Sequence, residues 1–94
     1  MVLPKSVKIF GQRFKIKVMP LHGYLGLCDR AAKIIYVESN QTESEIYQTL
    51  LHEIGHAVIG RTGIVQALSP ELEEIIVENI ATAIIDNFEF IPKI

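Results

Sequence analysis

The sequence predicts an α+β domain in which a small antiparallel or mixed sheet of three to four strands is followed by two helices. Before residue 40, apolar and polar residues alternate at the two-residue spacing of strands. After residue 42, apolar residues recur at the spacing of amphipathic helices. The chain has 94 residues, of which 49% are hydrophobic, and this is enough for one packed core. We therefore expect residues 1–94 to form a single domain.

The first half predicts a hairpin and two further strands. Residues 7–10 and 13–18 alternate cleanly, with Gly11 and Gln12 as the turn between them. Residues 24–28 are a weaker strand candidate. Residues 33–37 are rich in β-branched and aromatic side chains, which is typical of a strand.

The second half predicts two helices with clear start signals. Thr42 and Glu45 fit a capping box, and the helix that follows is expected to end near Gly60 or Gly63. Ser69 as N-cap and Pro70 at the first helical position predict a second helix. We expect this second helix to run to about Phe88.

The first predicted helix contains the pattern H-E-x-x-H, formed by His52, Glu53 and His56. Residues four apart lie on one face of a helix, so both imidazoles can bind a single metal ion. Zinc held in this way lowers the pKa of its water towards about 7, and a neighbouring carboxylate can accept the water's proton. The pattern therefore predicts a Zn²⁺ hydrolase with Glu53 as general base, against the alternative that three residues match by chance.

A catalytic zinc ion usually takes three protein ligands, and the second predicted helix offers four glutamates. Glu71 lies in the first turn, where an acid complements the helix dipole. Glu73 points away from the arc shared by the other three, so we expect it to be solvated. Glu78 lies in mid-helix among apolar neighbours, where a carboxylate is costly unless it is paired or metal-bound. We predict Glu78 as the third ligand. The alternatives that stay open are Glu74, His22, Cys28 and the absence of a third ligand.

Residues 24–88 resemble minimal zincin metallopeptidases of the ImmA/IrrE type, including short versions from phages and mobile elements. The likeness rests on the H-E-x-x-H stretch within residues 49–60 and on residues 78–81, Glu-Asn-Ile-Ala, which are similar to the family's E-x-x-A motif. The family commonly has Asn or Asp after that alanine, where this chain has Thr82.

The resemblance implies a ligand set of His52, His56 and Glu78, with Glu53 as general base. It also implies an edge strand over the cleft, here residues 33–37, that binds the substrate's backbone by strand addition. The implied substrate is a cytoplasmic protein, such as a regulator encoded by the same mobile element.

Other side chains are candidates for stabilising an oxyanion or for packing. Tyr24, Tyr36, Tyr47 and His22 could each stabilise the developing negative charge. Tyr47 is expected to pack, His22 to be a plain loop residue, and Cys28 to be a small buried hydrophobe.

Composition narrows the classes of partner. The net charge of −2 gives no electrostatic reason to expect nucleic-acid binding. No run of about 18 apolar residues is present, so we expect no membrane span, and the single cysteine favours the cytoplasm. Basic residues are concentrated before residue 34 and acidic residues after it, which we interpret as ordinary solvated faces.

Two functions remain in competition. The first is a zinc-dependent endopeptidase. The alternative is a catalytically silent zinc-binding scaffold that acts as a protein-interaction module, with a homodimer or a partner chain completing the cleft. Glu53 favours the enzyme, because structural zinc has no use for a general base.

Overall fold

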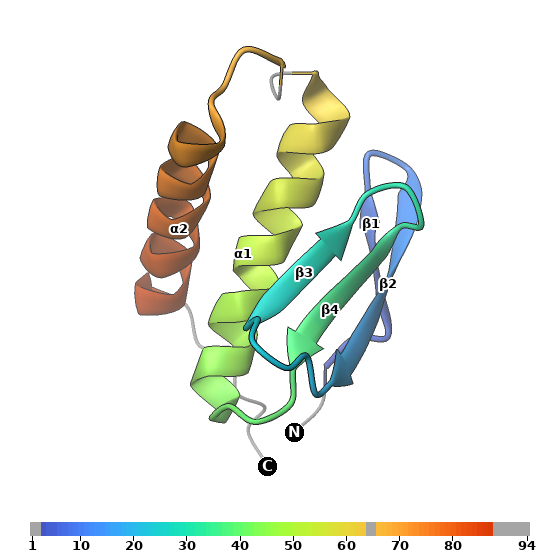
Figure 1. Ribbon diagram of the computed structural model, residues 1–94, viewed down its shortest axis with the longest axis vertical. Coiled ribbons are helices and arrows are strands. Elements are labelled where there is room, and N and C mark those ends of the chain that lie inside the picture. The colour runs from blue at the N-terminus through green and yellow to red at the C-terminus, as the bar shows by residue number, and fades with distance from the viewer. Residues whose placement is uncertain (1–2, 64–65, 88–94) are drawn as a thin grey trace.

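In the computed structural model, the described residues are 3–63 and 66–87. They form a sheet followed by two helices, which confirms the predicted α+β class. The elements in chain order are β1 (Ser6–Ile9), β2 (Gln12–Met19), β3 (Gly26–Asp29), β4 (Ile34–Glu38), α1 (Glu43–Thr62) and α2 (Pro70–Asn87). Helix α1 lies between the sheet and α2 (Figure 1).

The sheet is mixed, with the strand order β1-β2-β4-β3. Strands β1 and β2 form the predicted antiparallel hairpin, β2 and β4 run parallel, and β3 pairs antiparallel with β4. The hairpin turn is made by Phe10 and Gly11, whose φ angles are 47° and 79°. The turn predicted at Gly11 and Gln12 is one residue too late, because Gln12 already pairs with Ile9.

The prediction of residues 33–37 as the edge strand is wrong. Strand β4 pairs on both sides and is interior, so the edge strands are β1 and β3, and β3 is the edge next to β4. Burial explains the order: Ile35 and Val37 of β4 are fully buried, whereas β3 carries only half-buried and exposed residues. The more apolar strand occupies the centre of the sheet, against α1.

Both helices begin where the sequence predicts. The amide of Glu45 donates to Thr42 Oγ1 at 3.2 Å, and the amide of Thr42 donates to Glu45 Oε1 at 2.8 Å, which completes the capping box. Helix α1 ends at Gly63, whose φ of 81° is left-handed. Ser69 Oγ accepts from the amide of Leu72 at the start of α2. The predicted helix end at Phe88 lies outside the described residues.

A glycine sets the distance between the two helices. A Cβ added to Gly55 of α1 would lie 2.9 Å from Val77 Cγ1 of α2, closer than such atoms pack. Val77 and Ala81 are the residues that α2 buries most deeply. The contact between Gly55 and Val77 therefore fixes which turn of α2 faces the H-E-x-x-H stretch of α1.

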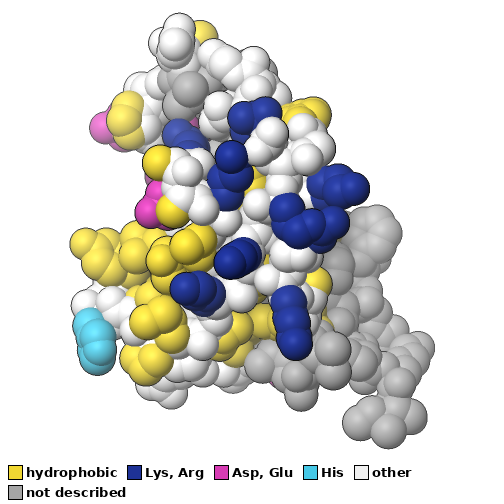
Figure 2. Space-filling view, turned by 90° about the vertical axis from the view of Figure 1, so that its right-hand side faces the viewer, with side chains coloured by type: hydrophobic (Ala, Val, Ile, Leu, Met, Phe, Trp, Pro, Cys, Tyr) yellow, Lys and Arg dark blue, Asp and Glu magenta, His cyan; other side chains and the backbone are white. Residues whose placement is uncertain are grey.

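The uneven charge predicted from the sequence appears on the surface. Figure 2 looks onto the sheet side of the molecule, where dark blue Lys and Arg side chains gather. The exposed basic residues of the first two strands are Lys8, Arg13, Lys15 and Lys17. Within residues 3–63 and 66–87, neither helix combines the length and apolarity needed to cross a bilayer.

Candidate metal centre

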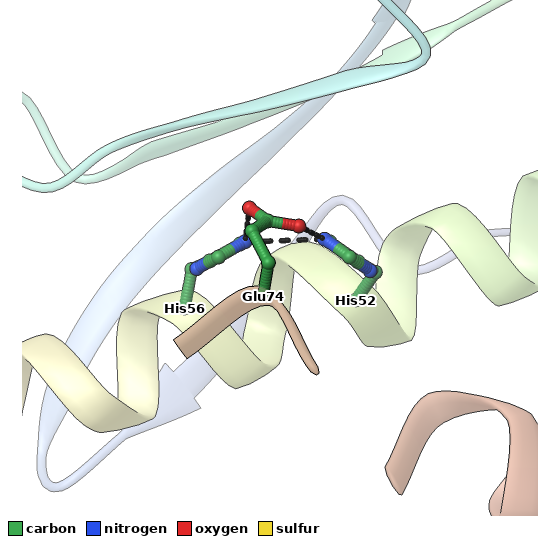
Figure 3. Close-up of side chains that lie close together, drawn as sticks. All are labelled: His52, His56 and Glu74. Carbon is green, nitrogen blue, oxygen red and sulfur yellow. Dashed lines mark hydrogen bonds and ion pairs between the residues drawn. The ribbon is translucent and has the colours of Figure 1, made fainter. Parts of the chain in front are cut away.

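Three side chains from the two helices converge on one point. His52 and His56 of α1 direct their Nε2 atoms towards each other at 3.1 Å. Glu74 of α2 lies over both rings, with Oε2 3.0 Å from His52 Nε2 and Oε1 2.8 Å from His56 Nε2 (Figure 3). One ligand atom from each residue lies within 4.8 Å of the other two.

The other ring nitrogens each contact a further glutamate of α2. His52 Nδ1 lies 2.7 Å from Glu78 Oε2, and His56 Nδ1 contacts Glu73 Oε2. When each Nδ1 donates its proton to the carboxylate behind it, the Nε2 atom of the same ring keeps its lone pair. A carboxylate behind each histidine is the usual support for a metal-binding imidazole.

This set of donor atoms fits a zinc ion. Two nitrogens bound to a tetrahedral zinc at about 2.0–2.1 Å are about 3.3 Å apart, close to the distance between the two Nε2 atoms. When both Nδ1 atoms carry the protons, two lone pairs and a carboxylate face one another. Such a group of acceptors is stabilised by a shared cation. His52, His56 and Glu74 could therefore hold the metal and leave a fourth position open.

Glu78, predicted as the third ligand, lies on the opposite side of the His52 ring. It is exposed, with 52% of its side chain accessible, and it also accepts from Gln48 Nε2 at 3.1 Å. The expectation that apolar neighbours make this carboxylate costly is wrong, because Glu78 itself is exposed and its neighbour Ile75 is 56% exposed. The geometry favours the open alternative Glu74, one turn closer to His56, with Glu78 orienting His52.

The expectation that Glu73 is solvated is also wrong. Glu73 is buried, and besides His56 it contacts Arg30 Nη2 at 2.7 Å. Burial opposes ionisation, but the hydrogen bond from His56 and the charge of Arg30 hold the pKa of Glu73 below its ordinary value. Helix α2 packs on α1 closely enough that the face carrying Glu73 is covered.

Glu53 is more buried than the three candidate ligands. Its residue is 8% exposed, and burial raises its pKa above the ordinary value, against the opposing effect of the two histidines. A Cβ on Gly26 of β3 would lie 2.9 Å from Glu53 Cγ and from Glu53 Oε2. The edge strand therefore passes directly over the carboxyl group.

Two adjoining hollows of about 710 and 510 Å³ meet at the cluster. Tyr24, Gly26, Glu53 and Glu74 line both of them, and His56 and His52 line one each. An extended segment lying along β3 could therefore occupy both hollows and cross the three converging side chains where the hollows meet.

The remaining candidates for oxyanion stabilisation lie at the larger hollow, in the core or in an exposed loop. Tyr24 and Tyr36 line the larger hollow, so both stay candidates for oxyanion stabilisation. Tyr47 is buried, as expected of a packing residue. His22 is exposed in a loop with a φ of 52° and lines none of the three hollows that surround the cluster in the described structure.

Cys28 is half-buried on β3 and packs against the core. Burial, together with the nearby Glu53, raises the pKa of its thiol to about 11. A thiol with such a pKa is almost wholly protonated at neutral pH, which fits the predicted packing role.

Arg30, Gly26 and Gly60 are residues of the site that sequence reasoning missed. Gly26 makes room for Glu53, and Gly60 makes room for Arg30. One signal was present: Gly60 lies inside a helix, where glycine is unfavourable unless another group needs the space. Nothing in the sequence pattern pairs Arg30 with Glu73, which is 43 residues away.

No protein-family model matches this chain, and no curated protein matches it.

Proposed function

We propose that this protein is a zinc-dependent endopeptidase in which His52, His56 and Glu74 hold the metal and Glu53 is the general base. The observation that carries the proposal is the convergence of both Nε2 atoms and a carboxylate beside a buried glutamate of raised pKa. This is the donor set of a catalytic zinc site with an open fourth position. The resemblance of the sequence to minimal zincins agrees with it.

The chain's own residues supply the proton transfers. A zinc ion in such a site activates water as a nucleophile and polarises a carbonyl group. Glu53 would accept the proton of the attacking water and return it to the leaving amine. A carboxyl group whose pKa is raised by burial holds a proton more readily near neutral pH, which suits both steps.

The edge of the sheet suits a peptide substrate. Strand β3 pairs with β4 on one side, and none of the other described strands pairs with its outer edge. The free backbone groups of an edge strand can bind an extended peptide by strand addition. Because the hollows extend on both sides of Glu53 and Glu74, cleavage within a chain is favoured over removal of a terminal residue.

A cytoplasmic protein substrate, such as a regulator from the same mobile element, is proposed on the resemblance. The competing function is a silent zinc-binding scaffold that holds a partner protein. One observation favours it: α2 exposes large apolar side chains that a partner or a second copy could cover, namely Leu72, Ile75, Ile76 and Ile80.

Zinc affinity and peptide hydrolysis, measured on four variants, test the ligand set. We expect Glu74→Ala to lose zinc, whereas Glu78→Ala should bind it more weakly, by up to about 10- to 100-fold, as variants of supporting residues do. Glu53→Gln should retain zinc but no longer cleave a zinc-dependent peptide substrate. Glu71→Ala, an exposed glutamate of the same helix, is the matched control.

Each contrary result has a definite meaning. Loss of zinc in Glu78→Ala with retention in Glu74→Ala would return the ligand role to Glu78. If wild type binds zinc but, like Glu53→Gln, hydrolyses no peptide in a broad library, the scaffold function is favoured. A wild-type protein that takes up no zinc would refute both functions.

A further inference from the structure

We infer that Arg30 and Glu73 form a brace that positions His56 for metal binding. The inference rests on the proposed zinc site and adds two positioning residues to it, neither of which contacts the metal. The brace links three elements, because Arg30 follows β3, His56 belongs to α1 and Glu73 belongs to α2.

Arg30 holds both the backbone and the side-chain partner of His56. Its Nε and Nη2 atoms donate to the carbonyl oxygen of His56 at 3.2 and 2.9 Å. Nη2 also donates to Glu73 Oε2 at 2.7 Å, and the same oxygen accepts from His56 Nδ1. One guanidinium thus fixes the carboxylate relative to the helix turn that carries the imidazole.

The brace decides which nitrogen of His56 faces the metal. The two carboxylates near the His56 ring differ in exposure: 11% of the Glu73 side chain is accessible, compared with 59% for Glu74. A hydrogen bond to the less solvated carboxylate is the stronger of the two, and Arg30 keeps that carboxylate ionised and in place. The proton therefore stays on Nδ1, and the Nε2 lone pair is directed at the cluster.

Gly60 leaves the space that the brace needs. A Cβ at Gly60 would lie 2.5 Å from Arg30 Nε and 2.6 Å from Arg30 Cδ. Alanine in a helix is normally more stable than glycine by roughly 0.5–1 kcal/mol. Alanine at this position would instead push the end of a flexible side chain off the helix. Since only that side chain must move, the substitution removes the brace and spares the core.

His52 has a weaker support. Its Nδ1 partner Glu78 is half exposed and is held by the neutral side chain of Gln48 rather than by a cation. Breaking the brace of His56 should therefore weaken zinc binding at least as much as removal of Glu78.

The test is a double-mutant cycle between Gly60→Ala and Arg30→Ala. The readouts are zinc affinity, by competition with a chromophoric chelator, and the free energy of unfolding of the metal-free protein. Each single variant should bind zinc about 10- to 100-fold more weakly, as expected for residues that support a ligand. The double variant should be no weaker than Arg30→Ala, because the added methyl acts only through Arg30.

A second readout follows the imidazole itself. Long-range ¹H–¹⁵N spectra of the metal-free protein, at a pH where histidines are neutral, should show His56 with its proton on Nδ1. Gly60→Ala and Glu73→Ala should shift the population towards Nε2. Glu73→Gln keeps an accepting oxygen and should restore part of the wild-type signal. Arg13→Ala, which removes an exposed arginine that donates to Ser6 Oγ, is the control.

The result that overturns the inference is specific. If wild type binds zinc while Gly60→Ala and Arg30→Ala bind it equally well with an unchanged His56 tautomer, the brace does not position His56. If both variants lose stability in parallel with zinc affinity, Arg30 is only structural and the inference fails. A wild type that binds no zinc refutes the proposed function instead, and the tautomer measurement still tests the brace.

Discussion

Replacing Gly26 by alanine should separate catalysis from metal binding. The φ angle of Gly26 lies outside the left-handed region, so its backbone suits any residue and only space is at issue. The new Cβ would lie 2.7 Å from Thr49 Cγ2 and 2.9 Å from Glu53 Cγ and Oε2. Both neighbours are buried and cannot simply rotate into solvent.

The size of the effect follows from the overlap. Ordinary contact begins at 3.4 Å, so β3 and α1 must separate, or Glu53 must turn, by about 0.5 to 0.7 Å. Overpacking of this kind costs about 1–3 kcal/mol of stability. A misplacement near 1 Å at a reacting group can lower a rate by about 100-fold, so we expect a 10- to 100-fold loss here. His52, His56 and Glu74 are untouched, and zinc affinity should match wild type.

The assay combines urea unfolding, zinc affinity and hydrolysis of a quenched fluorescent peptide. Gly60→Ala is the matched control, because the same added methyl there meets only the movable Arg30. It should lose zinc affinity but little stability, whereas Gly26→Ala should lose stability and activity but little zinc affinity. Unchanged stability and unchanged activity in Gly26→Ala would refute the argument that β3 packs directly on Glu53.

Two further predictions concern the fold and a pH dependence. Thr42→Ala removes the acceptor of the capping box and should destabilise the protein by about 1 kcal/mol, measured by chemical unfolding; an unchanged midpoint would show that the cap contributes nothing. Cys28 should be alkylated by iodoacetamide with an apparent pKa of about 11 in the folded protein, against 9.0 for an unperturbed thiol. Because the folded pKa is the higher one, the stability due to Cys28 is fully present below pH 9.0 and is lost as the pH rises towards 11. If folded and urea-unfolded protein are alkylated with the same pH midpoint, the predicted rise of the Cys28 pKa on folding is wrong.

The sequence alone determined the local elements of this protein. Thr42 with Glu45, and Ser69 with Pro70, mark the helix starts, because a helix N-terminus needs acceptors for its free amides from residues nearby in the chain. The spacing of His52 and His56 places both rings on one face for the same local reason, the pitch of a helix.

Tertiary structure decided the order of the strands and the role of each glutamate. The parallel pairing of β4 with β2 places β3, and not β4, at one edge of the sheet, and it depends on contacts between strands that are separated in the sequence. Helical pitch places Glu74 and Glu78 on one arc, but it does not determine how far α2 is shifted along α1. That offset comes from Gly55 packing on Val77, a contact between residues 22 positions apart in the sequence.

The burial of Glu73 has the same origin. Viewed along its own helix, Glu73 points away from the other glutamates, and this predicts solvent exposure. In the folded protein that direction leads to His56 of α1 and to Arg30 at the end of β3. Periodicity describes one helix at a time, whereas the surroundings of a side chain are set by every element that packs around it.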